Sequence, residues 1–392
     1  MPLAAPGPGL VPGAVEGGPD WLSGIYGDGL EIGAGAYYGF LWLALVSYLA
    51  VLVGASTLER RLLATAIAAL VLVFALAPPL LSADVFSYIS YARLATEHGL
   101  DPYDAVPAQV PTDEAFAHVG WKSSVSAYGP LFTLLTYPLG PLGVPAALWA
   151  IKAISALGVL AVIGLTARLA ALRGLDPRVA AAFVGLNPLV LVHVVGGGHN
   201  EALMMLLTLG GVAALAGAAP ALAGAALTAA TSIKISAAFA LPFALLGVKR
   251  RRRFAAAAAA MLALVGAASL AAFGADAVDS LELAGENQEL TTHFSIPSTV
   301  ARAVGADVDA IRVGALALYA AAVAGLMIWT SRRGDWLRAA AWAAFGLLIA
   351  TSWLLPWYLL WLLPLAALAR DRPLAMLAIG LTAWELGVRV PV

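Results

Sequence analysis

The sequence has very little charge and no cysteine. Only 11% of its 392 residues are charged, whereas soluble domains carry roughly 25%. Its apolar residues make up 61%, so it has too little polar surface to cover a globule of this size in water. The lack of cysteine excludes disulfides, thiolate metal sites and cysteine nucleophiles. The composition indicates a polytopic membrane protein and excludes a soluble enzyme, a disordered protein and a nucleic-acid binder.

Apolar runs recur along the chain, and a helix that crosses a bilayer needs roughly 20 apolar residues. The runs lie at about 36–58, 62–81, 145–167, 179–198, 200–218, 254–273, 311–330, 338–354, 356–369 and 374–390. The stretch 220–247 could form one steep helix or two short halves that meet near Ser232–Lys234. Counting the halves separately, we expect an all-α integral membrane protein of about 12 transmembrane segments. They form a single domain, 36–392, after a flexible external tail, 1–35.

The basic residues concentrate in alternate connections between these runs. Most of the 22 lysines and arginines fall there, whereas most of the 23 acidic residues do not. The positive-inside rule makes these connections cytoplasmic, so the basic run 249–253 is interpreted as a topology anchor rather than a nucleic-acid patch. Two long loops, about 82–144 and 274–310, are then external, together with both termini.

The first long loop begins with a polar helix. Ser82 can cap a helix that ends at His98-Gly99. Asp84, Tyr88 and Tyr91 share one face of it, at i, i+4 and i+7. A charged residue beside an apolar segment is a functional candidate, because burying charge in a membrane is costly. Asp84 is accordingly a candidate catalytic residue, and the alternative is an ordinary first-turn acid beside a cap.

Two further charged positions stand out. His199, Asn200 and Glu201 follow three glycines in an external turn, where polar residues are also expected for purely structural reasons. They are too few for a metal site, which needs three or four ligands. Lys234 lies about 14 residues from either end of its segment, and both ends are expected on the cytoplasmic side. A helix rises about 1.5 Å per residue, so Lys234 lies roughly 20 Å from that side. Its expected partner is either a lipid phosphate or the carboxylate of Glu201.

The order of these motifs resembles that of one enzyme family. The similar pieces are "SADVFSYISYARL", "GLDPYDAVP", "SAYGPLF", "GGGHNEALM", "TSIKISAAFALPF" and "LLPWYLLWLLPL". They run from about residue 80 to 365. In this order they are similar to the polyprenyl-phosphate-mannose-dependent α-mannosyltransferases of actinobacterial envelopes, which belong to the GT-C superfamily of membrane glycosyltransferases.

The resemblance implies a GT-C-like bundle that acts on the external face of the plasma membrane. It implies Asp84 as the catalytic base, and Lys234, Arg93 and His199 as ligands of the donor phosphate. The candidate substrate-binding residues are Tyr88, Tyr91, Tyr103, Tyr128, Asn200, Glu201, His293 and Trp357, and the alternative for Trp357 is a place in an interfacial aromatic belt. No cofactor is required, because the leaving polyprenyl phosphate is already a good anion, and a divalent cation is left as an open alternative.

The favoured function is inverting transfer of a hexose, mannose, from a polyprenyl-phosphate donor to a cell-envelope glycolipid or glycan. A lipid or solute transporter or flippase is the main alternative. Such proteins place ionisable residues near the bilayer midplane, whereas this sequence is nearly devoid of them there, and His193 and Lys234 are the deepest. A GT-C enzyme using another polyprenyl-phosphate sugar, such as arabinose, is a second alternative. A polysaccharide polymerase with a diphosphate-linked donor ranks lower, because few basic residues are left for the external side.

Overall fold

The computed structural model describes residues 34–274, 290–332 and 334–388, and all regular structure within them is helical. The α-helices are α1 (Ala34–Gly54), α2 (Arg60–Ala75), α3 (Asp84–His98), α4 (Pro130–Thr136), α5 (Val144–Leu172), α6 (Pro177–Gly185), α7 (Glu201–Ala216), α8 (Pro220–Ile233), α9 (Leu241–Gly247), α10 (Arg251–Phe273), α12 (Ile296–Val304), α13 (Val308–Ser331), α14 (Trp336–Ala350), α15 (Leu363–Leu368) and α16 (Arg372–Val388). The shorter elements are the 3-10 helices η4 (Ala55–Thr57), η5 (Pro107–Gln109), η6 (Tyr137–Leu142), η8 (Ile235–Ala240) and η10 (Pro356–Trp361), and the π-helix η7 (Val190–Val195). The prediction of an all-α protein is confirmed for these residues.

Four of the described helices are long and apolar enough to cross a membrane. They are α1 with the turn after it, α5, α10 and α13. Other predicted segments are divided into shorter helices. For example, α6 ends two residues before Asn187-Pro188 and the chain resumes as η7, because proline lacks the amide hydrogen that an uninterrupted helix needs. The count of about 12 segments stays a prediction. Residues 1–33 of the predicted tail and 275–289 of the predicted loop 274–310 lie outside the described residues.

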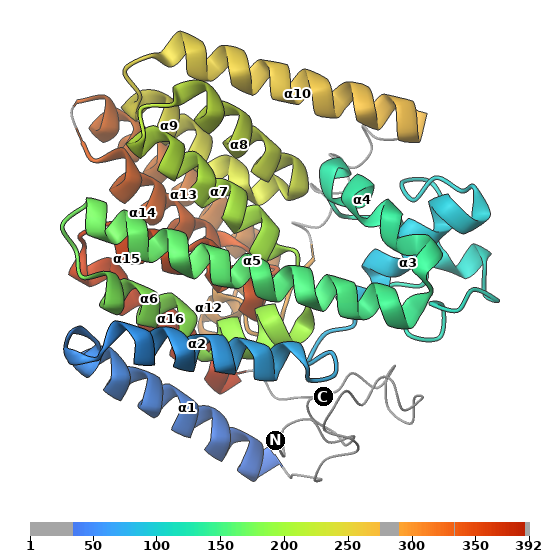
Figure 1. Cartoon of the computed structure of the whole chain (residues 1–392), viewed down its shortest axis with the longest axis horizontal. Coiled ribbons are helices and arrows are strands. Elements are labelled where there is room, and N and C mark those ends of the chain that lie inside the picture. The colour runs from blue at the N-terminus through green and yellow to red at the C-terminus, as the bar shows by residue number, and fades with distance from the viewer. Residues whose placement is uncertain (1–33, 275–289, 333, 389–392) are drawn as a thin grey trace.

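The helices form a bundle with α3 and α4 at one end (Figure 1). The connections α1–α2, α5–α6 and α9–α10, which contain basic residues, lie at the opposite end in the same view. The long helix α5 runs between the two ends and contacts α3, α6 and α7. The polar helix and these basic connections are therefore separated by the length of the bundle, which is the arrangement that the positive-inside interpretation requires.

The structure confirms one predicted helix end and decides between the two alternatives for the stretch 220–247. Helix α3 ends at His98, and Gly99 closes it in the left-handed conformation with φ of 65°. The stretch 220–247 is broken: α8 ends at Ile233, and Lys234 is extended, with φ −153° and ψ 121°. The lysine thus lies at a gap between two helices rather than on a continuous helix face.

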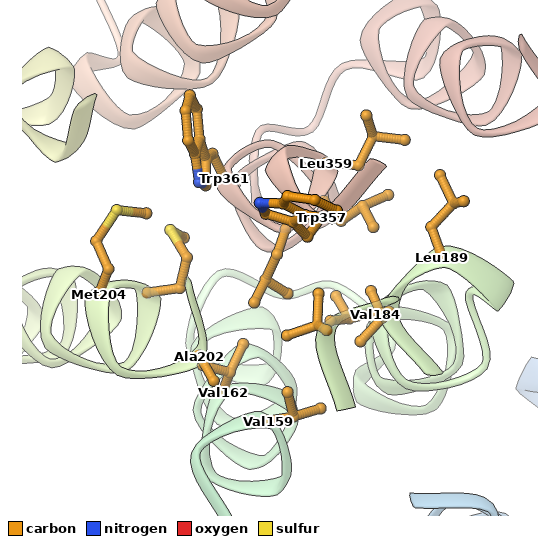
Figure 2. Close-up of a cluster of buried hydrophobic side chains, with 14 of the residues drawn as sticks. Val159, Val162, Val184, Leu189, Ala202, Met204, Trp357, Leu359 and Trp361 are labelled. Atoms are coloured by element: carbon orange, nitrogen blue, oxygen red, sulfur yellow. The ribbon is translucent and has the colours of Figure 1, made fainter. Parts of the chain in front are cut away.

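The buried core fixes η10 against α7 and η7. Figure 2 shows Trp357 of η10 in one cluster of buried side chains with Val159 and Val162 of α5 and Ala202 and Met204 of α7, and all five are buried. A closely packed interior tolerates little displacement of its members. The position of Trp357 is therefore set by the core, and Trp357 in turn positions the residues described next.

Candidate active site

A cavity of about 970 Å³ brings together residues that lie far apart in the sequence. Part of its lining is polar and comes from α3, the segment 121–130, the break at Lys234 and η10. The rest is largely apolar and includes Leu262, Val265 and Leu270 of α10 and Leu347 of α14. Among the described residues that line it, the two charged side chains are those of Asp84 and Lys234. The cavity thus combines one carboxylate, one ammonium group and an extended apolar surface.

Asp84 and Lys234 are linked through two buried side chains. Lys234 Nζ forms an ion pair with Oε1 of Glu201, whose side chain is fully buried. Oε2 of Glu201 lies 3.9 Å from Nδ1 of His199, and the same nitrogen lies 3.7 Å from Oδ2 of Asp84. The ammonium group also lies over the Tyr358 ring, 4.4 Å from its centre. Each member therefore lies within reach of the next, in the order Lys234, Glu201, His199, Asp84.

His199 is held by its surroundings in one orientation. Its ring stacks on Trp357, with 3.8 Å between ring centres and 19° between planes. The Tyr88 hydroxyl lies 3.5 Å from Nδ1, and Ser155 Oγ donates a hydrogen bond of 3.3 Å to the His199 carbonyl oxygen. The imidazole is completely buried and faces two carboxylates. Its geometry suits contact with Asp84 and Glu201 rather than with a molecule inside the cavity.

The Asp84 carboxyl has an environment typical of an acid–base group. It is one-fifth exposed and starts helix α3, whose first turn attracts negative charge. Burial raises the pKa of the Asp84 carboxyl to about 6, while the charge of Lys234 and a hydrogen bond from Trp121 act in the opposite direction. A pKa close to neutrality is what a general base requires, because the base must be deprotonated and still attract a proton.

Two polar side chains of α5 hold the glycine-rich turn that presents His199. Lys152 Nζ donates to the carbonyl oxygens of Gly196 at 2.5 Å and Val195 at 3.4 Å, and to that of Phe74 at 3.3 Å. Ser155, one turn further along α5, donates to the Val194 carbonyl oxygen at 3.0 Å. These bonds satisfy backbone acceptors that a membrane interior would otherwise leave unpaired. They fix the turn between η7 and α7.

Nine of the twelve predicted site residues converge here. Asp84, Tyr91, Tyr128, Lys234 and Trp357 line the cavity. A second group lies in contact with that wall without being part of the lining, and it comprises Tyr88, His199, Asn200 and Glu201. Asn200 is 3% exposed, and neither polar atom of its side chain has a hydrogen-bond partner.

The other three predicted residues lie elsewhere. Arg93 donates from Nε to both carboxylate oxygens of Asp113 at 3.0 Å and from a terminal nitrogen to the Gly140 carbonyl oxygen at 3.1 Å, so its guanidinium is engaged within the protein. The Tyr103 hydroxyl bonds Thr133 and the Tyr128 carbonyl oxygen. His293 is exposed and does not line the cavity. The structure therefore does not bring Arg93, Tyr103 and His293 to this site.

Sequence reasoning missed two residues. Lys152 carries the same signal as Lys234, a lysine within an apolar run, and could have been found by it. Trp121 hydrogen-bonds the Asp84 carboxyl and lines the cavity, but nothing in its sequence surroundings distinguishes it. Within the described residues, no group of three or more histidine, aspartate or glutamate side chains is placed to hold a metal ion.

Gly129 allows the first loop to approach the break at Lys234. Its amide donates to the Ile233 carbonyl oxygen at 3.1 Å, and a Cβ at this position would lie 2.3 Å from the Ser232 carbonyl oxygen. Because both contacts are with backbone, Gly129→Ala must displace the end of α8. We expect this variant to lose transferase activity and to melt at a lower temperature. The matched control is Gly164→Ala on α5, where a Cβ meets nothing within 4 Å. Equal activity and equal melting temperature of the two variants would contradict this explanation.

Comparisons with known proteins identify the family to which the chain belongs. Residues 11–250 match the family described as alpha-(1->6)-mannopyranosyltransferase, N-terminal domain. The chain is 30% identical to alpha-(1->6)-mannopyranosyltransferase A of Mycobacterium tuberculosis over 354 residues, which cover 81% of this chain and 68% of that protein. It is 32% identical to alpha-(1->6)-mannopyranosyltransferase A of Corynebacterium glutamicum over 186 residues, 45% of this chain and 36% of that protein. The chain therefore belongs to the alpha-(1->6)-mannopyranosyltransferase family and is a glycosyltransferase.

Proposed function

We propose that this enzyme transfers mannose from a polyprenyl-phosphate donor to a glycolipid or glycan acceptor of the cell envelope. The observation that carries the proposal is the cavity, which combines Asp84 and Lys234 with an extended apolar lining. A carboxylate can accept a proton from a sugar hydroxyl, an ammonium group can stabilise a phosphate, and an apolar surface suits a polyprenyl chain. The names of the relatives support mannose as the sugar.

Asp84 is assigned the role of general base. It takes the proton of an acceptor hydroxyl as the hydroxyl oxygen attacks the anomeric carbon and the bond to the phosphate oxygen breaks. A β-linked mannosyl phosphate then gives an α-mannoside with inversion, and the polyprenyl phosphate leaves as an anion. The proton passes to Asp84 and from there to solvent, since the Asp84 side chain is one-fifth exposed.

Lys234 is assigned to the donor phosphate and Glu201 to the positioning of Lys234. Among the described residues that line the cavity, Lys234 is the cation, and charge that develops on the leaving phosphate is stabilised by such a preorganised group. Glu201 and the ring of Tyr358 hold the ammonium group in place. His199 lies between the carboxylates of Glu201 and Asp84, so we assign it a positioning role rather than contact with phosphate.

The enzyme is further proposed to act on the external face of the plasma membrane. Helix α3, which begins with Asp84, lies at the end of the bundle opposite the basic connections α1–α2 and α5–α6 (Figure 1). By the positive-inside rule that end is external. A cysteine placed at the exposed Asp104 on this loop should react with an impermeant maleimide in intact cells, and labelling only after lysis would contradict the orientation.

The rate of transfer should depend on pH through Asp84. Because a base works only when deprotonated, kcat/KM should rise with pH and reach half its maximum at about pH 6, the pKa of Asp84. Trp121→Phe removes a hydrogen bond that lowers this pKa, so the midpoint should move to higher pH. The check is a kcat/KM profile for both proteins. A midpoint that does not move, or a rate that falls as pH rises through 6, would contradict the assignment.

A further inference from the structure

Two tryptophans from distant parts of the chain meet beside Asp84. Trp121 belongs to the first long loop and Trp353 to the segment after α14, and their ring centres are 6.1 Å apart at an angle of 63°. Both side chains line the cavity. The Trp121 side chain hydrogen-bonds the Asp84 carboxyl, so the pair adjoins the proposed general base.

The two rings remain accessible although their backbones are fixed. Trp121 is 41% exposed, and Trp353 is partly exposed. The Tyr91 hydroxyl donates to the carbonyl oxygens of Ser124 at 2.9 Å and Val125 at 3.1 Å, which anchors the loop next to Trp121. Ser352 Oγ donates to the Leu290 carbonyl oxygen at 2.9 Å, which anchors the chain at Trp353. Exposed aromatic faces on a fixed backbone are suited to binding rather than to filling a core.

We propose that Trp121 and Trp353 form a subsite for a pyranose residue of the acceptor, which places its hydroxyl at Asp84. This inference rests on the proposed function. The apolar C–H face of a pyranose matches an aromatic ring, whereas its hydroxyls need polar partners such as the Asp84 carboxylate beside it. The lining from α10 and α14 is apolar except for Ser269, whose hydroxyl donates to the Val265 carbonyl oxygen of its own helix, so it suits the donor lipid instead. The tryptophan pair therefore serves the acceptor.

The test compares alanine and phenylalanine variants at both positions. Trp121→Ala and Trp353→Ala should each raise the KM for a manno-oligosaccharide acceptor by roughly tenfold, because each loses one aromatic contact, and should leave the donor KM unchanged. Trp121→Phe keeps a ring, so at pH 8, above the midpoint of the profile, its acceptor KM should stay near that of the wild type. Trp42→Ala, at a tryptophan that is 45% exposed on α1 and lies outside the cavity lining, is the matched control.

A binding measurement separates this inference from the proposed function. Saturation-transfer NMR should detect binding of an α-linked manno-oligosaccharide to the Asp84→Asn protein. The binding signal should disappear when Trp121→Ala or Trp353→Ala is added to that variant. Unchanged acceptor KM and unchanged binding in both alanine variants would overturn the subsite while leaving transfer intact. The opposite result is a wild-type protein that binds the oligosaccharide through these tryptophans but transfers no sugar. That result would overturn the proposed function and retain the subsite.

Discussion

Asp84→Asn is expected to lower the rate of sugar transfer by about 10²–10⁴-fold, which is what a general base contributes. The amide has the shape of the carboxyl but does not take up a proton at neutral pH. The Trp121 hydrogen bond can still be accepted by the amide oxygen, so the fold should persist. The rate is measured as radiolabelled mannose transferred from polyprenyl-phosphate mannose to a manno-oligosaccharide by the purified protein.

Asp104→Asn is the matched control for this variant. Asp104 is an exposed acid of the same loop and does not line the cavity, so its loss should leave the rate within about twofold of the wild type. Both proteins should elute as single species and melt at similar temperatures. A folded Asp84→Asn protein that keeps the wild-type rate would remove Asp84 from the mechanism.

Lys234→Met is expected to have the second large effect, on both activity and stability. Removing one partner of a buried ion pair leaves the other charge uncompensated, which costs roughly 3–5 kcal/mol in the free energy of unfolding. Glu201 is the buried partner, with no exposed side-chain surface. The rate of transfer should also fall by about 10²–10³-fold, because the leaving phosphate loses its nearest cation. Lys122→Met, at a cation of the first loop that lies over Phe116 outside the cavity, is the control.

The double variant Lys234→Met, Glu201→Gln separates the two effects. Removing both charges leaves no unpaired ion, so stability should return most of the way toward the wild type. Activity should not return, since the cation is still missing. If the double variant were less stable than Lys234→Met alone, the ion pair would not account for the loss. If it were active, Lys234 would have no role at the phosphate.

The local features of the site could be predicted from the sequence. Helix α3 ends at Gly99 as predicted, but its N-cap is Ala83 rather than Ser82, and the Ser82 hydroxyl instead accepts a hydrogen bond from the amide of the first helical residue, Asp84, at 3.2 Å. The break at Lys234 was one of two predicted alternatives, since a charge inside an apolar run favours a place where the backbone is interrupted. Its partner, Glu201, was likewise one of two candidates. The helix end and the break depend on residues within a few turns of each other, whereas the pairing of Lys234 with Glu201, 33 residues away, is a tertiary contact, which is why the sequence leaves two partners open.

The partners brought together by tertiary packing could not be predicted. Arg93 was expected at the donor phosphate, but Asp113, 20 residues away, occupies its guanidinium. The Trp121–Trp353 pair joins segments more than 200 residues apart, and the local sequence around each tryptophan does not indicate the other as its partner. Periodicity and caps describe one helix at a time, whereas these contacts depend on how the first loop folds over η10 and α8.

The most direct test of the account is a donor panel with the purified wild-type protein in lipid nanodiscs. Polyprenyl-phosphate mannose, glucose and arabinose are each supplied with a manno-oligosaccharide, and products are analysed by mass and by the anomeric configuration of the new bond. The account predicts an added hexose from the mannose donor, in α linkage, and none from the Asp84→Asn protein. A folded wild-type protein that transfers no sugar from any of the three donors would contradict it.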